Sequence, residues 1–563
     1  MSQKLIECVP NFSEGVNLDI IKQITSEIES VEGVRLLNVD PGKATNRTVV
    51  TFVGEPEKVI EAAFLAIKKA GELIDMSKQK GEHPRMGATD VCPLIPISNI
   101  SMEETAEYAR QLAKRVGEEL QIPVYLYEQA QPDKSRSNLS VIRAGEYEGF
   151  FKKIKLPEWA PDFGPAENDV KRGATVIGAR DFLVAYNVNL NTTSTRRANA
   201  IAFDVREAGR TMREGDPVTG KVVTDENGKP RSIPGSLKAV KAIGWYIEEY
   251  GIAQISMNLT NIEITPVHKA FDEVCAKANE RGIRVTGSEL VGLIPLKAML
   301  DAGKYFLRKQ QRSVGVSEKE LIRIAIKSMG LDELGPFIPE ERIIEYLLKD
   351  KAESKLVSMS LVDFADETAS ESPAPGGGSI SAYVGSLGAS LAGMVANLSS
   401  HKKGWDKRWE EFSDWAGKAQ LYKDELIRLV DLDTTAFNRI MESFSLPKST
   451  NEEKMARDKA IQDATKYAIE IPFKVMQAAL NSMEVIKAMA ETGNPNSVTD
   501  AGVAALCART AVLGAFMNVK INASGYKDKD FVVDVVYRGN EIERKAIALE
   551  TEIIALVNAK IGV

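Results

Sequence analysis

The chain has 563 residues, which is more than a single hydrophobic core usually spans, so we expect two to four domains. Its 44% hydrophobic and 27% charged residues are typical of a soluble globular protein. The net charge of −7 argues against a nucleic-acid partner or an anionic membrane partner, because both need a basic surface. The sequence shows no signal segment and no apolar run of membrane-spanning length, so we expect a cytoplasmic protein.

Cysteines and histidines are few and scattered. The four cysteines lie far apart without CxxC spacing, which fits a reducing compartment better than a disulfide framework. The three histidines, His83, His268 and His401, are not spaced as pairs of metal ligands. We therefore expect no metal site.

Residues 1–180 alternate short apolar runs with amphipathic segments, which predicts an α/β subdomain. Strands are predicted at residues 5–9, 34–39, 47–53, 91–95 and 123–127. Helices are predicted at residues 18–30, 57–73 and 102–119. This order is close to a split βαβ pattern, an open mixed sheet with helices on one face. A linker-like stretch with three prolines, residues 156–165, ends this run of elements.

A second α/β subdomain of the same kind is predicted over residues 181–330. The pattern after the proline-rich stretch gives strands at 174–177, 182–190, 240–247 and 253–258, and helices at 194–208 and 267–280. Residues 212–234 are polar and rich in Gly, Asp and Lys, which predicts a protruding hairpin that we interpret as a solvated insertion. Two similar α/β units in one chain suggest a ligand cleft between them.

The strand pattern disappears after about residue 317. We expect a helical linker over residues 331–355 and an all-α helical bundle over residues 356–563. Long helices are predicted at residues 409–444, 452–490, 500–522 and 541–560. The predicted fold is therefore multidomain, with two α/β subdomains followed by a helical bundle.

One loop of the first subdomain has the character of a site. His83 lies in the loop at residues 80–90, where Gly81, Pro84 and Gly87 prevent a helix. A histidine beside a strand end, with carboxylates and a guanidinium nearby, can act as a base near neutral pH. The spacing leaves open the alternative that His83 only caps the strand and bonds to the backbone.

In the helical half, one carboxylate is placed unusually. Asp433 lies three or four residues from Leu429, Val430 and Phe437, so its helical phase puts it on the core stripe. An inward carboxylate is costly unless it is bonded or used, which favours a functional role. Asp431 lies on another face, and we expect it to be solvated.

Small residues surround the start of the helix after Pro375. Glycines within this helix, such as Gly385, Gly388 and Gly393, permit close packing in a bundle, and a helix N-terminus after the three glycines at 376–378 presents free N–H groups that can bind a ligand. Both interpretations remain open. For Asn518 and Asn522, one turn apart on a later helix, core hydrogen bonding and ligand binding fit equally well.

Several stretches together resemble one family, the bifunctional glutamate formimidoyltransferase/formimidoyltetrahydrofolate cyclodeaminases. They are residues 7–15 (ECVPNFSEG), 45–48, 80–96, 162–165, 173–180, 287–292, 345–347, 374–379 and 430–433. Each stretch is short, but their order and spacing are specific and extend over nearly the whole chain.

The resemblance implies a transferase and lyase of histidine degradation. The first reaction moves a formimidoyl group from N-formimidoyl-L-glutamate to N5 of tetrahydrofolate, and the second closes the product to 5,10-methenyltetrahydrofolate with loss of ammonia. It implies that His83 is the transferase base and that Asp433 is the cyclodeaminase carboxylate. The implied folate-binding residues are Gly164, Pro165, Ala166, Glu167, Asn168, Asp169, Val170, Lys171, Arg172 and Gly173.

The resemblance also implies tetrahydrofolate, in polyglutamylated form, as co-substrate, no metal, and a ring-like homo-oligomer. Arg85 or Asn46 would then be available for substrate carboxylates, and Asp40 for orienting the base. A competing hypothesis makes the α/β half the sole enzyme, a formimidoyltransferase, and the helical half only an oligomerisation scaffold.

Overall fold

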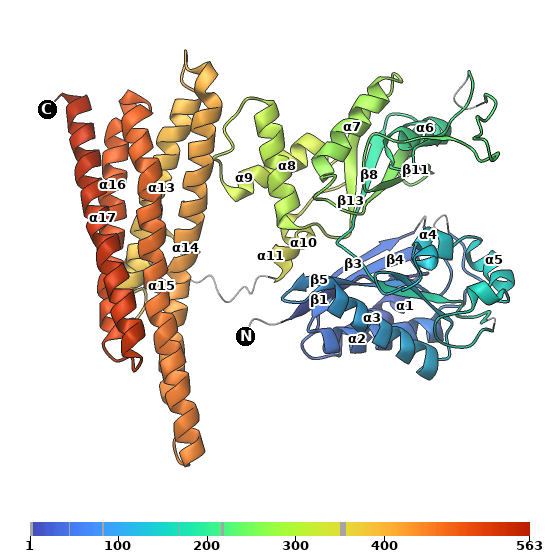
Figure 1. Cartoon of the computed structure of the whole chain (residues 1–563), viewed down its shortest axis with the longest axis horizontal. Helices are drawn as coiled ribbons and strands as arrows, with labels where there is room; N and C mark the ends of the chain where they lie inside the picture. The colour runs from blue at the N-terminus through green and yellow to red at the C-terminus, as the bar shows by residue number, and fades with distance from the viewer. Residues whose placement is uncertain are drawn as a thin grey trace. The chain divides into compact units, whose positions relative to one another are not determined.

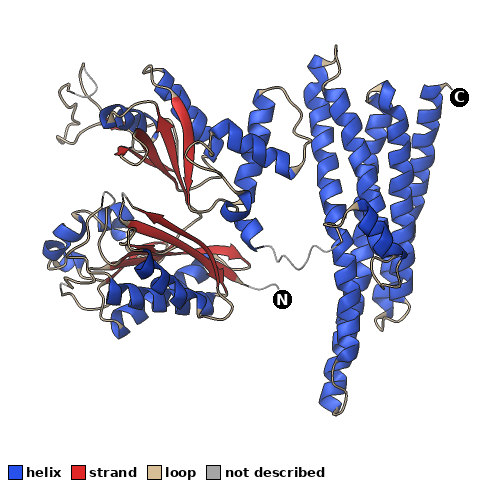
Figure 2. Ribbon diagram, turned by 180° about the vertical axis from the view of Figure 1, so that it is seen from behind, coloured by secondary structure: helices blue, strands red, loops and turns tan. Residues whose placement is uncertain are grey.

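The computed structural model describes residues 4–43, 45–81, 84–167, 169–215, 219–348 and 356–562. Contacts divide the chain into two compact units, the first made of Met1–Ala302 and Ala325–Leu348, the second of Gly303–Ile324 and Lys349–Val563. All described strands lie in the first unit, and the second is helical (Figure 1, Figure 2). The predicted fold class, α/β subdomains followed by a helical bundle, is confirmed.

The contact units and the predicted domain bounds are not identical. Residues 303–324, placed by the sequence in the second α/β subdomain, pack with the helical unit. Residues 331–348, placed in the linker, pack with the first unit. The residue ranges of the four predicted regions stay a prediction.

The first sheet is mixed and has seven strands. They are β1 (Leu5–Cys8), β2 (Asn11–Phe12), β3 (Arg35–Gly42), β4 (Arg47–Gly54), β5 (Thr89–Ser98), β6 (Val124–Glu128) and β7 (Thr175–Ala179). Both β1 and β2 pair with β4 on one side and β5 on the other. β7 runs parallel to β5 and β6 and lies between them. The strand expected at 174–177 therefore completes the first sheet and is not part of the second.

Long helices cover one face of this sheet, as the pattern predicts (Figure 1). They are α1 (Leu18–Glu29), α2 (Pro56–Leu73) and α3 (Met102–Glu119). Strand residues such as Ile6, Phe52 and Leu94 pack in the core beneath them. Two short helices, α4 (Leu139–Ile142) and α5 (Glu146–Lys153), follow β6, and their Ile142 and Phe150 join a separate core with Tyr125.

The second sheet is antiparallel, with the order β11-β12-β8-β13. Its strands are β8 (Val184–Leu190), β11 (Val240–Ile247), β12 (Ile252–Leu259) and β13 (Val285–Val291), and its long helices are α6 (Thr195–Val205) and α7 (Val267–Asn279). We did not predict β13, because Gly287 and Ser288 interrupt its apolar alternation. From here on, residues 1–180 are the first subdomain, and residues 181–302 with 325–348 are the second.

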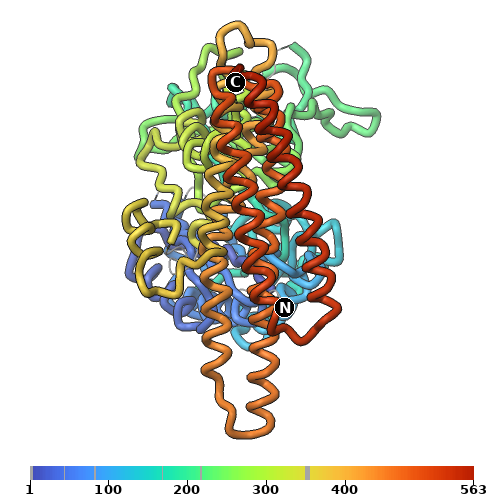
Figure 3. The backbone as a smooth tube through the Cα atoms, turned by 90° about the vertical axis from the view of Figure 1, so that its left-hand side faces the viewer, coloured from blue at the N-terminus to red at the C-terminus, as the bar shows by residue number. Residues whose placement is uncertain are grey.

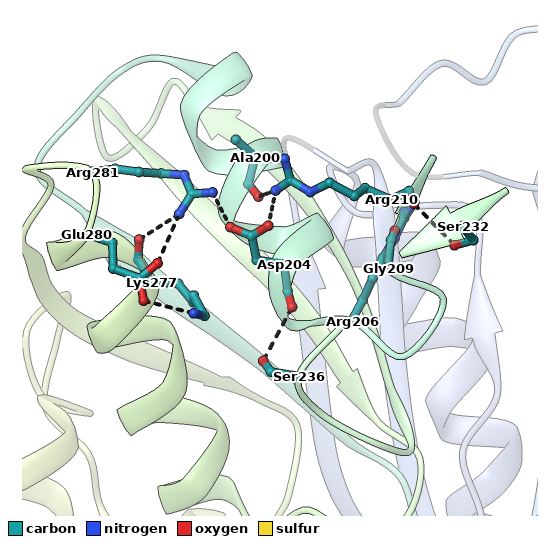
Figure 4. A network of polar contacts seen from close by, with 10 residues as sticks. All are labelled: Ala200, Asp204, Arg206, Gly209, Arg210, Ser232, Ser236, Lys277, Glu280 and Arg281. Atoms are coloured by element: carbon teal, nitrogen blue, oxygen red, sulfur yellow. Dashed lines mark hydrogen bonds and ion pairs between the residues drawn. The ribbon is translucent and has the colours of Figure 1, made fainter. Parts of the chain in front are cut away.

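The insertion at residues 212–234 forms the predicted hairpin, based on two short strands. These are β9 (Arg210–Thr211) and β10 (Ser232–Ile233). Figure 4 shows how the hairpin is attached: Asp204 of α6 pairs with Arg210 at the hairpin base and with Arg281 after α7. Ser232 Oγ lies 3.2 Å from the Arg210 carbonyl. A carboxylate shared by two guanidiniums therefore fixes the base of the insertion.

Helices make up the rest of the chain. In chain order, the last strand is followed by α8 (Leu296–Lys309), which we did not predict, α9 (Glu318–Met329), α10 (Pro339–Arg342) and α11 (Ile344–Leu348). The bundle contains α12 (Leu361–Ala369), α13 (Gly377–Ser400), α14 (Trp409–Ser445), α15 (Asn451–Thr492), α16 (Val498–Ala523) and α17 (Lys529–Ile561). The C-terminal end of α14 and the N-terminal end of α15 extend beyond the other bundle helices (Figure 3). In α13, Gly385 lies against Ala511, with only 3.0 Å between an added Cβ and the alanine methyl group, so small residues do permit close packing.

Two bundle helices reach the length and hydropathy of a membrane span, contrary to our expectation. Gly377–Ser400 has a mean hydropathy of 1.3 and Pro495–Ala523 of 1.5 over 18-residue windows. Within the structure, 61% and 50% of these windows are buried. A buried core helix of a soluble protein has the same composition, so these helices are weak grounds for a membrane span.

Candidate active sites

The loop that carries His83 is anchored on its N-terminal side. His83 and the residue before it lie outside the described residues, but the preceding segment is well defined by contacts. Asn46 Nδ2 donates a hydrogen bond to the Lys80 carbonyl at 2.9 Å. A Cβ on Gly81 would lie 2.2 Å from the Thr45 carbonyl oxygen, so only glycine permits this approach.

On its C-terminal side, the same loop is joined to the predicted folate-binding segment. Ala88 N donates to the Arg172 carbonyl at 2.8 Å, and Gly87 and Gly173 form an antiparallel bridge. A Cβ on Gly173, whose φ is +70°, would lie 2.2 Å from the Met86 carbonyl oxygen. Two segments that the sequence singled out separately are therefore in direct contact.

Within the predicted folate-binding segment, three charged side chains are bonded to the protein itself. Arg172 pairs with Asp169, and its NH1 donates to the Leu120 carbonyl at 2.7 Å. Lys171 Nζ donates to the Glu72 carbonyl at 2.7 Å. These side chains hold the segment in place, which leaves other residues of the segment to contact a ligand.

The remaining side chains of the segment are more accessible. Ala166, Glu167 and Val170 are exposed and Pro165 is half-buried. Asn168 lies outside the described residues.

A buried carboxylate shared by two arginines lies at the start of β5. Asp90 is 1% exposed, and its Oδ2 pairs with Arg143 and with Arg47 NH1, the latter at 3.3 Å. Asn11 Oδ1 accepts from Arg47 Nε at 2.8 Å. Burial lowers the pKa of Arg47 to about 9, while Asp90 opposes this shift, so Arg47 remains cationic at neutral pH. Two guanidiniums against one carboxylate leave an excess positive charge suited to an anion.

The groups proposed from sequence for substrate carboxylates have other partners. Arg85 NH2 lies 3.0 Å from Glu148 Oε1 and donates to the Gln79 carbonyl at 2.8 Å. Asn46 Oδ1 accepts from Gly15 N at 2.9 Å. Arg47 and Arg143 are also paired with the protein, but their two positive charges exceed the one negative charge of Asp90, whereas Arg85 lies near two carboxylates. Sequence reasoning missed this cluster because its three members come from distant segments.

Asp40 lies where the two α/β subdomains meet. Its Oδ2 accepts from Gly292 N at 3.1 Å and lies 3.9 Å from Arg342 NH1. Close by in the fold, an apolar cluster joins Leu37, Val53, Leu293 and Ile344. Within this unit, the faces of the two sheets that lack the long helices are turned toward each other (Figure 1). The described contacts thus give Asp40 a role at this junction, and its predicted role as orienter of His83 stays a prediction.

In the helical unit, Asp433 lies against the N-terminus of α13. Ser379 Oγ is 3.1 Å from Asp433 Oδ2 and 2.9 Å from the Val430 carbonyl. A Cβ on Gly378 would lie 2.2 Å from Asp433 Oδ1. Burial raises the pKa of Asp433 above its ordinary value, and hydrogen bonds from the hydroxyl and backbone of Ser379 oppose this shift. The result is a half-buried carboxyl group that holds its proton more tightly than an exposed aspartate does.

The structure refines the predicted surroundings of Asp433. Leu429 and Val430 are fully buried, as helical phase predicts, whereas Phe437 is 37% exposed. Asp431 is half-buried and accepts a hydrogen bond from Leu356 N at 2.9 Å, so the expectation that it is merely solvated was wrong. Its carboxylate anchors the chain where the bundle begins.

Of the two asparagines, one is structural and one borders the site. Asn522 Nδ2 donates to the Ala468 carbonyl at 2.8 Å, which supports the core interpretation. Asn518 Nδ2 donates to the Gly514 carbonyl and would lie 3.2 Å from a Cβ on Gly377. The start of α13 is therefore flanked by Asp433 and by an amide from α16.

We expect Gly378→Ala to destabilise the helical unit by about 1–3 kcal/mol, because the added methyl group overlaps the Asp433 carboxylate. Gly376→Ala is the matched control: it lies at the N-cap with φ −96°, and its added Cβ meets nothing closer than 3.9 Å. Denaturant unfolding of both variants checks the contact. Equal stability of the two would contradict the placement of Asp433.

Among the described residues, no group of three or more His, Cys, Asp and Glu side chains is arranged to hold a metal ion. The described side chains of the two candidate sites supply carboxyl, guanidinium, amide and hydroxyl groups.

Comparison with known families covers most of the chain. The family described as "Formiminotransferase domain, N-terminal subdomain" matches residues 5–180, and "Formiminotransferase domain" matches residues 185–349. The family described as "Formiminotransferase-cyclodeaminase" matches residues 360–540.

Individual relatives match the whole chain or one half of it. A formimidoyltransferase-cyclodeaminase from Gallus gallus is 45% identical over 529 residues, 94% of each chain. A glutamate formimidoyltransferase from Thermoplasma acidophilum is 42% identical over 306 residues, 54% of this chain and 92% of the relative. A methenyltetrahydrofolate cyclohydrolase from Methylorubrum extorquens is 34% identical over 199 residues, 35% of this chain and 96% of the relative.

These matches define an enzyme that joins a formiminotransferase region to a cyclodeaminase region. The chain belongs to the formimidoyltransferase-cyclodeaminase family, which confirms the resemblance drawn from the sequence.

Proposed function

We propose that this protein transfers the formimidoyl group of N-formimidoyl-L-glutamate to tetrahydrofolate, giving glutamate and 5-formimidoyltetrahydrofolate. It then cyclises that product to 5,10-methenyltetrahydrofolate with release of ammonia. The observation that carries this proposal is the match over 94% of the chain to a relative named for both activities. The separate matches of each half to single-activity relatives support it.

For the transfer step, the proposed base is His83. N5 of tetrahydrofolate attacks the amidine carbon, and its proton must leave as the new bond forms. The excess positive charge of Arg47 and Arg143 beside Asp90 suits the carboxylates of the glutamyl substrate. The loop on either side of His83 is anchored, so a reacting group there can be held in a defined position.

For the cyclisation step, the proposed catalytic group is Asp433. N10 closes onto the formimidoyl carbon, and ammonia leaves only after its nitrogen has gained a proton. A carboxyl group with a raised pKa can supply that proton and later accept one. Ser379 and Gly378 fix the carboxyl group against the start of α13.

Folate binding along residues 164–173 is part of this proposal. The contact between this segment and the loop at residues 80–90 supports it, since the transferase base must lie near N5 of the folate. We further propose that the folate is polyglutamylated, that no metal takes part, and that the protein is a cytoplasmic homo-oligomer.

The proposal is tested by separating the two halves. We expect residues 1–348 to release glutamate from N-formimidoyl-L-glutamate and tetrahydrofolate, and residues 356–563 to release ammonia from 5-formimidoyltetrahydrofolate. A relative that matches 35% of this chain over 96% of its own length supports independent folding of a part of this size. The helical fragment loses the contact of Val314 N with Ser413 Oγ at 3.0 Å, so a lower melting temperature is expected. A folded helical fragment, in its native assembly, that releases no ammonia would favour the scaffold hypothesis.

A further inference from the structure

Glu7 is a buried acid with no assigned role. It lies in the middle of β1, and its neighbours Ile6 and Cys8 belong to the core beneath the long helices. Because side chains alternate along a strand, Glu7 points to the opposite face of the sheet. That face is the one turned toward the second sheet (Figure 1).

Apolar residues surround Glu7 on its sheet. It lies opposite Val53 of β4 and Ile95 of β5. Val53 packs in a cluster with Leu293 and Ile344 of the second subdomain. The side chain of Glu7 is therefore close to the junction of the two subdomains, and the residue is only 2% exposed.

The carboxyl group of Glu7 is incompletely satisfied. Its Oε2 is buried and has no hydrogen-bond partner in the described part of the chain. Burial raises the pKa of Glu7 to about 7, and attraction by Arg180 only partly offsets this shift. Burial also raises the pKa of the neighbouring Cys8 thiol, which lies 3.5 Å from Cys92 Sγ, so Cys8 supplies no positive charge to a carboxylate. A buried carboxyl group of this kind is costly unless a donor or a cation completes it.

The proposed substrate carries such a group. Its formimidoyl end is an amidine, which is protonated near neutral pH and presents planar N–H donors with a positive charge. Like a guanidinium, an amidinium can pair with both oxygens of one carboxylate. The other end of the substrate carries carboxylates, which Glu7 repels and which Arg47 and Arg143 suit.

We propose that Glu7 binds the amidinium group of N-formimidoyl-L-glutamate and so selects this donor, whose formimidoyl end is cationic, over a formyl analogue whose corresponding end is uncharged. The inference rests on the transferase function proposed above. Because Glu7 is enclosed by protein, it requires side chains at the subdomain junction to move aside as the substrate binds.

The pairing has a thermodynamic consequence. A bound cation lowers the pKa of Glu7, so the fraction of Glu7 that is protonated before binding loses its proton. With a starting pKa near 7, about half a proton is released per site at pH 7. N-formyl-L-glutamate, which has the same carboxylates but an uncharged formamide in place of the amidinium, releases none from Glu7. The difference in proton release between the two ligands separates the contribution of Glu7 from that of other titrating groups.

The test is calorimetric binding of both ligands at pH 7, in two buffers with different ionisation enthalpies, to the full-length protein. The wild-type protein is expected to release about half a proton more with the formimidoyl ligand. Glu7→Gln, which keeps the side-chain shape, is expected to abolish that difference and to raise KM for N-formimidoyl-L-glutamate about 10-fold or more. The inhibition constant of N-formyl-L-glutamate is expected to change less than about threefold. Glu103→Gln, an exposed residue of α3, serves as control.

Two results would overturn the inference: equal proton release for the two ligands in the wild type, or an equal loss of affinity for both in Glu7→Gln. The second would show that Glu7 only supports the fold or holds a water molecule. The wild-type measurement needs no variant, so it decides the matter even if Glu7→Gln does not fold. If the wild-type protein transfers no formimidoyl group to tetrahydrofolate, the proposed function fails; if it transfers and the two ligands behave alike, only the role of Glu7 fails.

Discussion

Asp433→Asn is expected to reduce ammonia release from 5-formimidoyltetrahydrofolate on the order of 10²-fold or more, with formimidoyl transfer unchanged. The asparagine keeps the shape that fits against Gly378 and can still accept the hydrogen bond from Ser379 through its carbonyl oxygen. What it removes is the exchangeable proton. Activity should therefore fall much more than stability.

The pH dependence of stability gives a second measure of the same group. Burial raises the folded-state pKa of Asp433 above its unfolded value. The stability linked to this group is then fully present below the unfolded pKa and is lost as pH rises through the folded pKa. Above the folded-state pKa the ionised carboxylate thus lowers stability, so at such a pH Asp433→Asn should melt at the same temperature as the wild type or higher. The difference should shrink as the pH falls toward the unfolded pKa.

Asp431→Asn is the matched control for this prediction. Asp431 lies two residues away and binds Leu356 N, a bond that an asparagine oxygen can also accept. It should alter ammonia release much less than Asp433→Asn does. A larger loss of ammonia release in Asp431→Asn would show that Asp433 is the wrong carboxylate. A loss of assembly without loss of turnover in Asp433→Asn would show that Asp433 has a purely structural role.

Helical phase was enough to single out Asp433, because a 3.6-residue period assigns each position to a face without knowledge of its partners. The residues of other helices that pack against that face cannot be read from this period. The contact with Ser379 and Gly378 depends on how α13 meets α14, and the role of Asp431 depends on a residue 75 positions earlier. The helical period therefore identified Asp433 but not the residues that hold its carboxyl group in place.

In the α/β half, even more of the site depends on contacts between distant segments, which sequence patterns do not give. Chain order does not encode strand order, so nothing in residues 174–177 indicates that β7 inserts between β5 and β6. Alternation in β1 places Glu7 on the face away from the helices, which in a single sheet reads as solvent-exposed. It is buried because a second subdomain covers that face. The cluster of Arg47, Asp90 and Arg143 likewise exists only after three separate segments have folded together.

His83→Ala is expected to reduce formimidoyl transfer on the order of 10²-fold or more while leaving ammonia release intact. The loop should keep its course in the variant, because its described anchors lie before and after His83. Asn46 holds the Lys80 carbonyl on one side, and Ala88 is bonded to Arg172 on the other. The melting temperature should therefore change little, and the loss should appear mainly in kcat.

The matched control is His401→Ala, which removes the same side chain from the end of α13 in the helical unit. Glutamate release, measured for both variants and the wild type across pH, separates the possibilities. A base that titrates near neutrality should give the wild type an acidic limb that His83→Ala lacks and His401→Ala retains. If His83→Ala transfers at the wild-type rate with the same acidic limb, the base is another group. The cationic pair at Asp90 would then remain a binding site for the substrate carboxylates, since its charge does not depend on the histidine.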